Sequence, residues 1–279
     1  MPLSAQRWTE IRDDWEWRTE MQTTQVRLPE ANVVIALATS GDCAGPYQDA
    51  HDFLNARGAV DSGEQIDLLF VVAEASDPFW PSRTANLCRR ATLALVLPMV
   101  CVEKGAEQFP AGPTVYYEWM LRFFDALVVT DAAPIDVLRH CVDFLSPVVI
   151  GTDFADLHAC LAGTRILWFH RIDAAPDSRT SDAIGRDASL RSQLERASHV
   201  LAVAYIRDTD PAFTTIGDLR AMSSGATMVA QACPRQAGTL PSMSLLLAET
   251  RREGDLIERE RPDDQSVLEI ERVSISQRS

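Results

Sequence analysis

The chain has 279 residues, with 26 Lys and Arg against 40 Asp and Glu, which gives a formal net charge of −14. Hydrophobic residues make up 46% of it, enough apolar material for one large domain or two ordinary ones. The excess of acid argues against a protein that binds nucleic acid or anionic lipid by neutralising phosphates.

No segment of the sequence predicts a membrane span, a secretory signal or a metal site. The longest strongly apolar stretch, Ala91–Val102, is too short to cross a membrane and contains Pro98. The N-terminus has no apolar signal core. The six cysteines form no CxxC pair and have no histidine at ligand spacing. We therefore expect a reduced, cytoplasmic protein with no disulfide framework and no metal.

The two ends of the chain differ from its middle. Residues 1–30 predict an amphipathic leader, in which Trp8, Ile11 and Trp15 share one face of a helix. This helix either packs on the domain or docks a partner through Trp8 and Trp15. Residues 251–279 carry 14 charged residues in 29 and predict a hairpin or a solvated tail.

Strands and helices alternate after the leader. Continuous apolar runs predict buried strands at 32–39, 65–73, 93–102 and 124–130. Helical patterns are expected at 46–56, 82–91 and 116–124. The alternation predicts an α/β domain over residues 31–131 with a doubly wound, mostly parallel sheet.

A central helix is expected at 132–145, because Ile135, Leu138, Val142 and Leu145 share one face and Pro147 ends the pattern. Beyond it the elements are more widely spaced. Helices are expected at 153–162, 178–197 and 213–223, and strands at 166–170, 199–206, 226–233 and 242–250. This spacing predicts that the central helix joins the first domain to a smaller α+β domain over residues 146–250.

The loop after the first of these strands could bind phosphate. A glycine-bearing turn from a strand into a helix offers backbone N–H groups and the helix dipole to an anion. Only Gly41 and Gly45 serve that purpose here, and Asp42 between them would repel a phosphate. A loop without a ligand is the simpler interpretation.

The loop after the second strand is less suited to phosphate. Residues 73–84 contain no glycine, and Glu74, Asp77, Phe79 and Trp80 occupy the place of a backbone cradle. We therefore expect this loop to be closed to a di- or triphosphate. Under the alternative of an unusual nucleotide pocket, Ser82, Arg83 and Thr84 would hold phosphate or Mg²⁺ at the following helix.

A third candidate is the stretch Gly151-Thr152-Asp153-Phe154-Ala155-Asp156. Two acids at positions i and i+3 have a structural explanation, because Asp153 can cap a helix and Asp156 can complete a capping box. The sequence segments on either side of this stretch give it a second, functional interpretation.

The order of motifs resembles the tubulin/FtsZ superfamily over residues 31–250. Its cell-division members carry an N-x-D-F-A-D loop directly after the central helix, and GTDFAD occupies that place here, with Gly151 instead of Asn. Family members also have a DALIVIP strand and a helix opening A-A-N-D-V-L. The corresponding segments are Phe124–Val129 and Ala132–Leu138.

The departures from the family imply loss of the nucleotide. Glu74–Arg83 replaces the family's glycine-rich phosphate loop, and Pro134-Ile135 replaces the Asn that contacts guanine. The resemblance thus implies a pseudo-GTPase without a cofactor, or GTP binding only under the alternative of an active GTPase with an unusual phosphate loop. A nucleotide-independent, self-assembling structural subunit is the other alternative.

The resemblance also implies where a partner would bind. In filaments of the family, the acidic loop enters the next subunit's nucleotide pocket and orients the hydrolytic water. Asp153 and Asp156 would then act in trans on the GTP of a related GTPase. Around them, Gly151, Thr152 and Phe154 would contact that partner, which is a relative or a second copy of this chain.

Overall fold

The computed structural model describes residues 21–39, 46–58, 60, 63–73, 80–98, 124–146, 153–162, 164, 166–173, 180–206, 212–223, 225–234 and 243–249. The expectations for Trp8, Trp15, Gly41, Gly45, Gly151, Thr152, the helix at 116–124 and the tail 251–279 lie outside the described residues.

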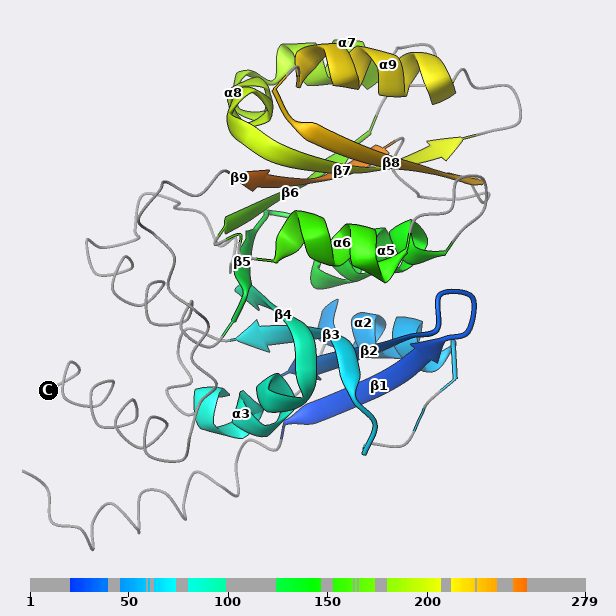
Figure 1. The fold of residues 1–279 in the computed structure, drawn as a ribbon, viewed down its shortest axis with the longest axis vertical. Helices are drawn as coiled ribbons and strands as arrows, with labels where there is room; N and C mark the ends of the chain where they lie inside the picture. The colour runs from blue at the N-terminus through cyan, green and yellow to red at the C-terminus, as the bar shows by residue number, and fades with distance from the viewer. Residues whose placement is uncertain are drawn as a thin grey trace, which may run out of the picture.

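A nine-stranded mixed sheet in the order β1-β2-β3-β4-β5-β6-β9-β7-β8 forms the framework (Figure 1). Its strands are β1 (Gln22–Leu28), β2 (Val33–Thr39), β3 (Ile66–Ala73), β4 (Ala91–Pro98), β5 (Ala126–Val129), β6 (Ile166–Ile172), β7 (Ala197–Ile206), β8 (Thr227–Pro234) and β9 (Met243–Glu249). Pairing is parallel from β2 to β6 and between β7 and β8, and antiparallel at β1–β2, β6–β9 and β9–β7. The expected α/β class with a mostly parallel sheet is confirmed.

The helices follow the strands closely. They are α2 (Pro46–Asn55), α3 (Trp80–Arg90), α5 (Pro134–Leu145), α6 (Phe154–Leu161), α7 (Thr180–Arg186), α8 (Ala188–Arg196) and α9 (Ala212–Met222). Pro46 and Pro134 stand at the first helical position, where a missing N–H costs nothing. The expected helix over 178–197 is divided by Asp187, whose side chain caps α8 by accepting a bond from the backbone N–H of Leu190.

Strand β1 corrects the prediction of an amphipathic helical leader over residues 1–30. Residues 22–28 instead pair with β2 at the edge of the sheet, in the register Gln22↔Thr39 to Leu28↔Val33. Only Val26 and Leu28 are apolar in this strand, so its sequence gives a weak strand pattern. Pairing with the fully buried β2 provides the stability that this local pattern lacks.

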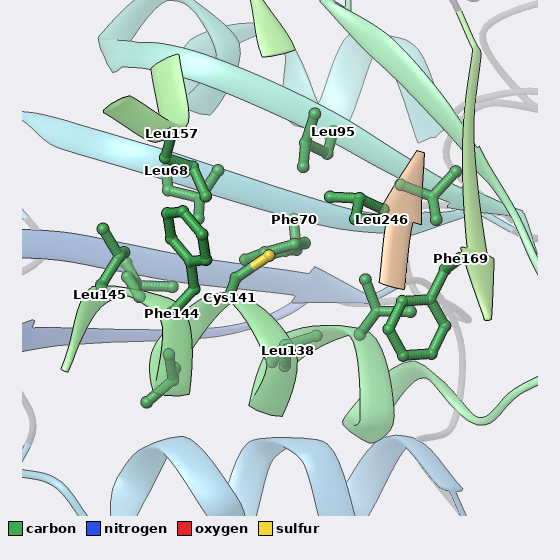
Figure 2. Packing of buried hydrophobic residues seen from close by; sticks show 14 of the residues in the cluster. Leu68, Phe70, Leu95, Leu138, Cys141, Phe144, Leu145, Leu157, Phe169 and Leu246 are labelled. Atoms are coloured by element: carbon green, nitrogen blue, oxygen red, sulfur yellow. The ribbon is translucent and has the colours of Figure 1, made fainter. Parts of the chain in front are cut away.

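Helix α5 lies at the centre of the main hydrophobic core. Its side chains meet residues of strands from both halves of the sheet, and Figure 2 shows Cys141 and Phe144 among Leu68, Phe70 and Leu246. In Figure 1 it lies, with α6, between β1–β4 and β6–β9. The expected central helix thus has its predicted extent to within two residues.

The two faces of the sheet carry different helices. Helices α2, α5 and α6 contribute to the main core, whereas Cys88 of α3 belongs to a second cluster on the opposite face of β2–β5. Helices α7, α8 and α9 cover a third cluster over β7 and β9. Strands β6–β9 lie in the part of the chain predicted to form a second domain, and they belong to the same sheet through the β5–β6 pairing. Strand pairing therefore gives no evidence for or against the predicted domain boundary.

Candidate functional site

The acidic motif opens helix α6 and forms a capping box. The backbone N–H of Asp156 donates to Asp153 Oδ1 over 3.0 Å, and the N–H of Asp153 donates to Asp156 Oδ2 over 3.2 Å. Both side chains are exposed. The structural explanation of this i, i+3 pair is therefore correct, and the box leaves both carboxylates at the surface.

The rest of α6 explains why the acids point outward. Leu157, Cys160 and Leu161 are buried against the main core and form the inner face of the helix. Phe154 is half-buried, and its ring centroid lies 6.0 Å from that of His158 one turn later. Asp153 and Asp156 fall on the outer side of this amphipathic pattern, exposed to solvent.

The exposed pair can position a water molecule. The capping box uses one oxygen of each carboxylate, and an ionised carboxylate accepts hydrogen bonds at both oxygens. Such a group can orient a water or polarise it beside a phosphoryl centre supplied by another molecule.

The residues named for a possible nucleotide pocket lie in helix α3. This helix begins at Trp80, two residues before the expected start, so Ser82, Arg83 and Thr84 fall in its first turn and a half. The side chain of Thr84 is 1% exposed. Because α3 and α6 pack on opposite faces of the sheet, the structure does not bring Thr84 together with Asp153. The two predicted sites are separate.

A polar cluster at the end of α5 was not foreseen from the sequence. Asp143, in the last turn of α5, accepts a hydrogen bond at Oδ2 from the hydroxyl of Tyr205 on β7 over 3.0 Å. Burial raises the pKa of the Asp143 carboxyl, against the opposing effects of this hydrogen bond and of Arg57 and Arg139. Burial and the neighbouring carboxylate also raise the pKa of Tyr205, so the phenol remains the donor.

Strand β8 contributes two further donors to this helix end. Gln231 Nε2 donates to the carbonyl oxygen of Ser146, the C-cap residue of α5, over 3.1 Å. Cys233 Sγ lies 3.5 Å from the carbonyl oxygen of Asp143 and donates to it. The last carbonyls of a helix lack their usual backbone partners. Gln231 supplies a donor to the Ser146 carbonyl, whereas the Asp143 carbonyl also accepts the backbone N–H of Ser146 over 3.3 Å.

Sequence separation explains why this cluster was missed. Its contacts join residues 62, 85 and 90 positions apart, and no local spacing signals them. The only hint in the sequence is polar residues within the apolar runs of β7 and β8. We call Tyr205, Gln231 and Cys233 the helix clamp.

Other chemistries find no support in the described part of the chain. It contains no group of three or more His, Cys, Asp or Glu side chains placed to hold a metal. Cys88, Cys141, Cys160 and Cys233 are buried and form no disulfide. Among the helices described, none is long and apolar enough to cross a membrane.

Comparisons with known proteins give structural likeness only. No protein-family model matches the sequence, and no curated protein matches it. The solved structures that resemble it include an empty FtsZ dimer of M. jannaschii, with 15% identity and a TM-score of 0.48 over 70% of this chain and 66% of that chain. The chain thus spans slightly less than two thirds of that FtsZ chain.

Two TubZ structures of Bacillus thuringiensis are also similar. The GDP-form protofilament has 12% identity and a TM-score of 0.44 over 84% of this chain and 70% of that chain. The GTPγS-form protofilament has 12% identity and a TM-score of 0.46, with 83% and 70% covered. None of the three reaches a TM-score of 0.5, so function has to be inferred from the residues of this chain.

Proposed function

We propose that this chain is a pseudo-GTPase of the tubulin/FtsZ type that acts through protein contacts on a GTP-binding relative. It serves as a filament partner, a cap or a regulator in the cytoplasm. Asp153 and Asp156 face the partner's nucleotide and act on its hydrolytic water in trans. The chain itself needs no cofactor.

One observation carries this proposal. The two carboxylates of the DFAD motif are fixed by a capping box and exposed at the start of the helix that follows the central helix. A fixed, exposed pair of acids suits contact with a second molecule. Neighbouring Phe154 is half-buried and adds apolar surface beside the acids.

The strand-to-helix connections of the first domain support the absence of a nucleotide. Ligands in open α/β sheets bind outside the carboxyl ends of the strands. The sequence that follows β3, Glu74–Phe79, contains two acids and no glycine. Buried Thr84 is poorly placed to coordinate a phosphate or its Mg²⁺.

A nucleotide titration tests the first half of the proposal. GTP and GDP are titrated into the full chain by calorimetry, with a GTP-binding FtsZ as the positive control. We expect no heat of binding at micromolar to millimolar nucleotide. Micromolar binding would refute the pseudo-GTPase assignment and favour the alternative of an unusual phosphate loop.

The second half is tested on a polymerising FtsZ from the same source. The double variant Asp153→Asn with Asp156→Asn keeps the capping acceptors but removes both charges, because Asn caps a helix as well as Asp does. We expect the wild-type chain to change the GTPase rate of FtsZ and the double variant to lose that effect at unchanged thermal stability. Asp187→Asn is the matched control, since Asp187 is an exposed N-cap of α8.

The outcomes separate chemistry from capping. If the double variant acts like the wild type, the carboxylates have only a capping role and the proposal fails. If the wild-type chain sediments as filaments without FtsZ and without nucleotide, the alternative of a self-assembling structural subunit is correct.

A further inference from the structure

A cavity of about 300 Å³ lies at the outer edge of β1. This strand is the first of the sheet and has β2 on one side only (Figure 1). The last residues of α2 and α3, Asn55 and Arg90, both line the cavity, because an edge strand can be reached by helices from either face of the sheet. Leu87 and Val60 add apolar lining. The volume is that of a small ligand site.

The charged end of this cavity is separate from the loops considered for a nucleotide. Arg90 directly precedes β4, and its guanidinium donates to the carbonyl oxygen of Glu64, two residues before the start of β3. Both positions are at the amino ends of parallel strands, whereas ligands of open α/β sheets usually bind outside the carboxyl ends. What the cavity binds therefore does not depend on the proposed pseudo-GTPase role.

Arg90 makes the cavity suitable for an anion. The Glu64 carbonyl is a neutral acceptor, and no carboxylate among the described residues lies within ion-pair distance of Arg90. The carboxylate of Glu64 is paired instead with Arg27, whose guanidinium lies 2.6 Å from Oε2. The residues that line the cavity include no acid. Because a guanidinium has five N–H donors, most of those of Arg90 remain available for a negatively charged group.

Uncharged polar groups beside Arg90 also lack protein partners. Gln25 lines the cavity and is only 6% exposed, yet its Oε1 has no hydrogen-bond partner in the described part of the chain. The N–H of Val60 donates to the backbone carbonyl of Gln25, so this backbone faces away from β2, and that of Thr23, two residues earlier, does the same. The cavity thus offers both donors and acceptors next to the guanidinium.

We propose that this cavity binds a small organic anion that also carries a hydroxyl group, a hydroxycarboxylate or the phosphate ester of a polyol. The anionic group binds the available N–H groups of Arg90. The hydroxyl group exchanges hydrogen bonds with Gln25 Oε1 and with the outward-facing backbone of Thr23, and Leu87 and Val60 contact the carbon skeleton. An uncharged polyol lacks the group that Arg90 selects.

Calorimetric titration of the full chain with 3-hydroxybutyrate and with glycerol 3-phosphate tests for the site. Glycerol is the uncharged control, since it is the second probe without its phosphate. We expect saturable binding of at least one anion with a Kd on the order of 1 mM or below, and none of glycerol. The anion that binds distinguishes a carboxylate from a phosphate site. If neither anion binds at about ten times that concentration, the proposal is overturned.

Two variants show whether binding takes place in this cavity. Arg90→Gln removes its charge, and Arg89→Gln is the matched control, because Arg89 is an exposed neighbour that does not line the cavity. Asn55→Asp adds a negative charge at an exposed position without changing the size of the side chain, so it remains informative if Arg90→Gln fails to fold. We expect Arg90→Gln and Asn55→Asp to weaken binding roughly 10-fold or more, and Arg89→Gln to bind like the wild type. Equal binding by Arg90→Gln and Arg89→Gln, or wild-type binding by Asn55→Asp, overturns the assignment.

Discussion

His140 provides a quantitative test of the core around the central helix. This residue lies on α5, is fully buried, and has Nδ1 2.8 Å from Ser244 Oγ. Its ring meets Phe169 edge-on at 5.6 Å and is stacked at 6.4 Å from Phe144. With Nε2 unpartnered among the described residues, burial lowers the pKa of His140 from 6.5 to about 3.

The sign of the pH dependence follows from this shift. Between pH 6.5 and pH 3 the unfolded chain binds a proton at His140 and the native chain does not. The free energy of unfolding therefore falls as the pH falls, by about 1.4 kcal/mol per pH unit from this residue. At pH 5 the loss is about 2 kcal/mol relative to pH 7.

Urea unfolding of the wild type and of His140→Phe at pH 7, 6 and 5 measures this loss. Phe keeps an aromatic ring beside Phe144 and Phe169, and Ser244 keeps its hydrogen bond with Tyr205. We expect the variant to lose about 1 kcal/mol at pH 7, for the missing hydrogen bond. Between pH 7 and pH 5 the wild type should then lose about 2 kcal/mol more of its free energy of unfolding than the variant loses. Parallel pH profiles would refute the reasoning, because all other titrating groups are common to both proteins.

Substitutions at three further residues test other parts of the structure by urea unfolding. Thr39→Val should lower the free energy of unfolding by about 1–3 kcal/mol, because it deprives buried His51 Nε2 of a hydroxyl 3.0 Å away; an unchanged midpoint would contradict that hydrogen bond. Phe144→Ala should cost about 3–5 kcal/mol, since this fully buried ring lies in the main core, and a cost under 1 kcal/mol would mean that α5 is not central. Asp153→Ala should lower the free energy of unfolding by about 1 kcal/mol, and Asp153→Asn should leave it nearly unchanged. Equal losses in the two variants would argue against the capping box.

The central helix and the capping box could be predicted from the sequence because their signals are local. Leu138, Val142 and Leu145 repeat at helical spacing, and all three are buried in the structure. Asp153 and Asp156 are three residues apart, the spacing that a capping box requires. In both cases the interacting residues lie within one or two turns of each other.

Features set by tertiary contact could not be predicted in this way. Strand β1 takes its register from β2, and the sequence QTTQVRL alone does not distinguish it from a loop. His140 meets Ser244 across 104 positions, and Gln231 meets Ser146 across 85. Such pairs can be identified only in the folded structure, in which the sheet brings distant segments together. They join α5 to strands β8 and β9.

Under the proposed function, a structural role and a functional role occupy the same two residues, Asp153 and Asp156. A capping box fixes each carboxylate through one oxygen, which lowers the entropy that a partner would otherwise have to remove on binding. The remaining oxygens stay available at the surface. If the proposed function is correct, capping pre-organises the pair for contact with a partner. The Asn variants separate the two roles because they keep the hydrogen-bond geometry and remove only the charge.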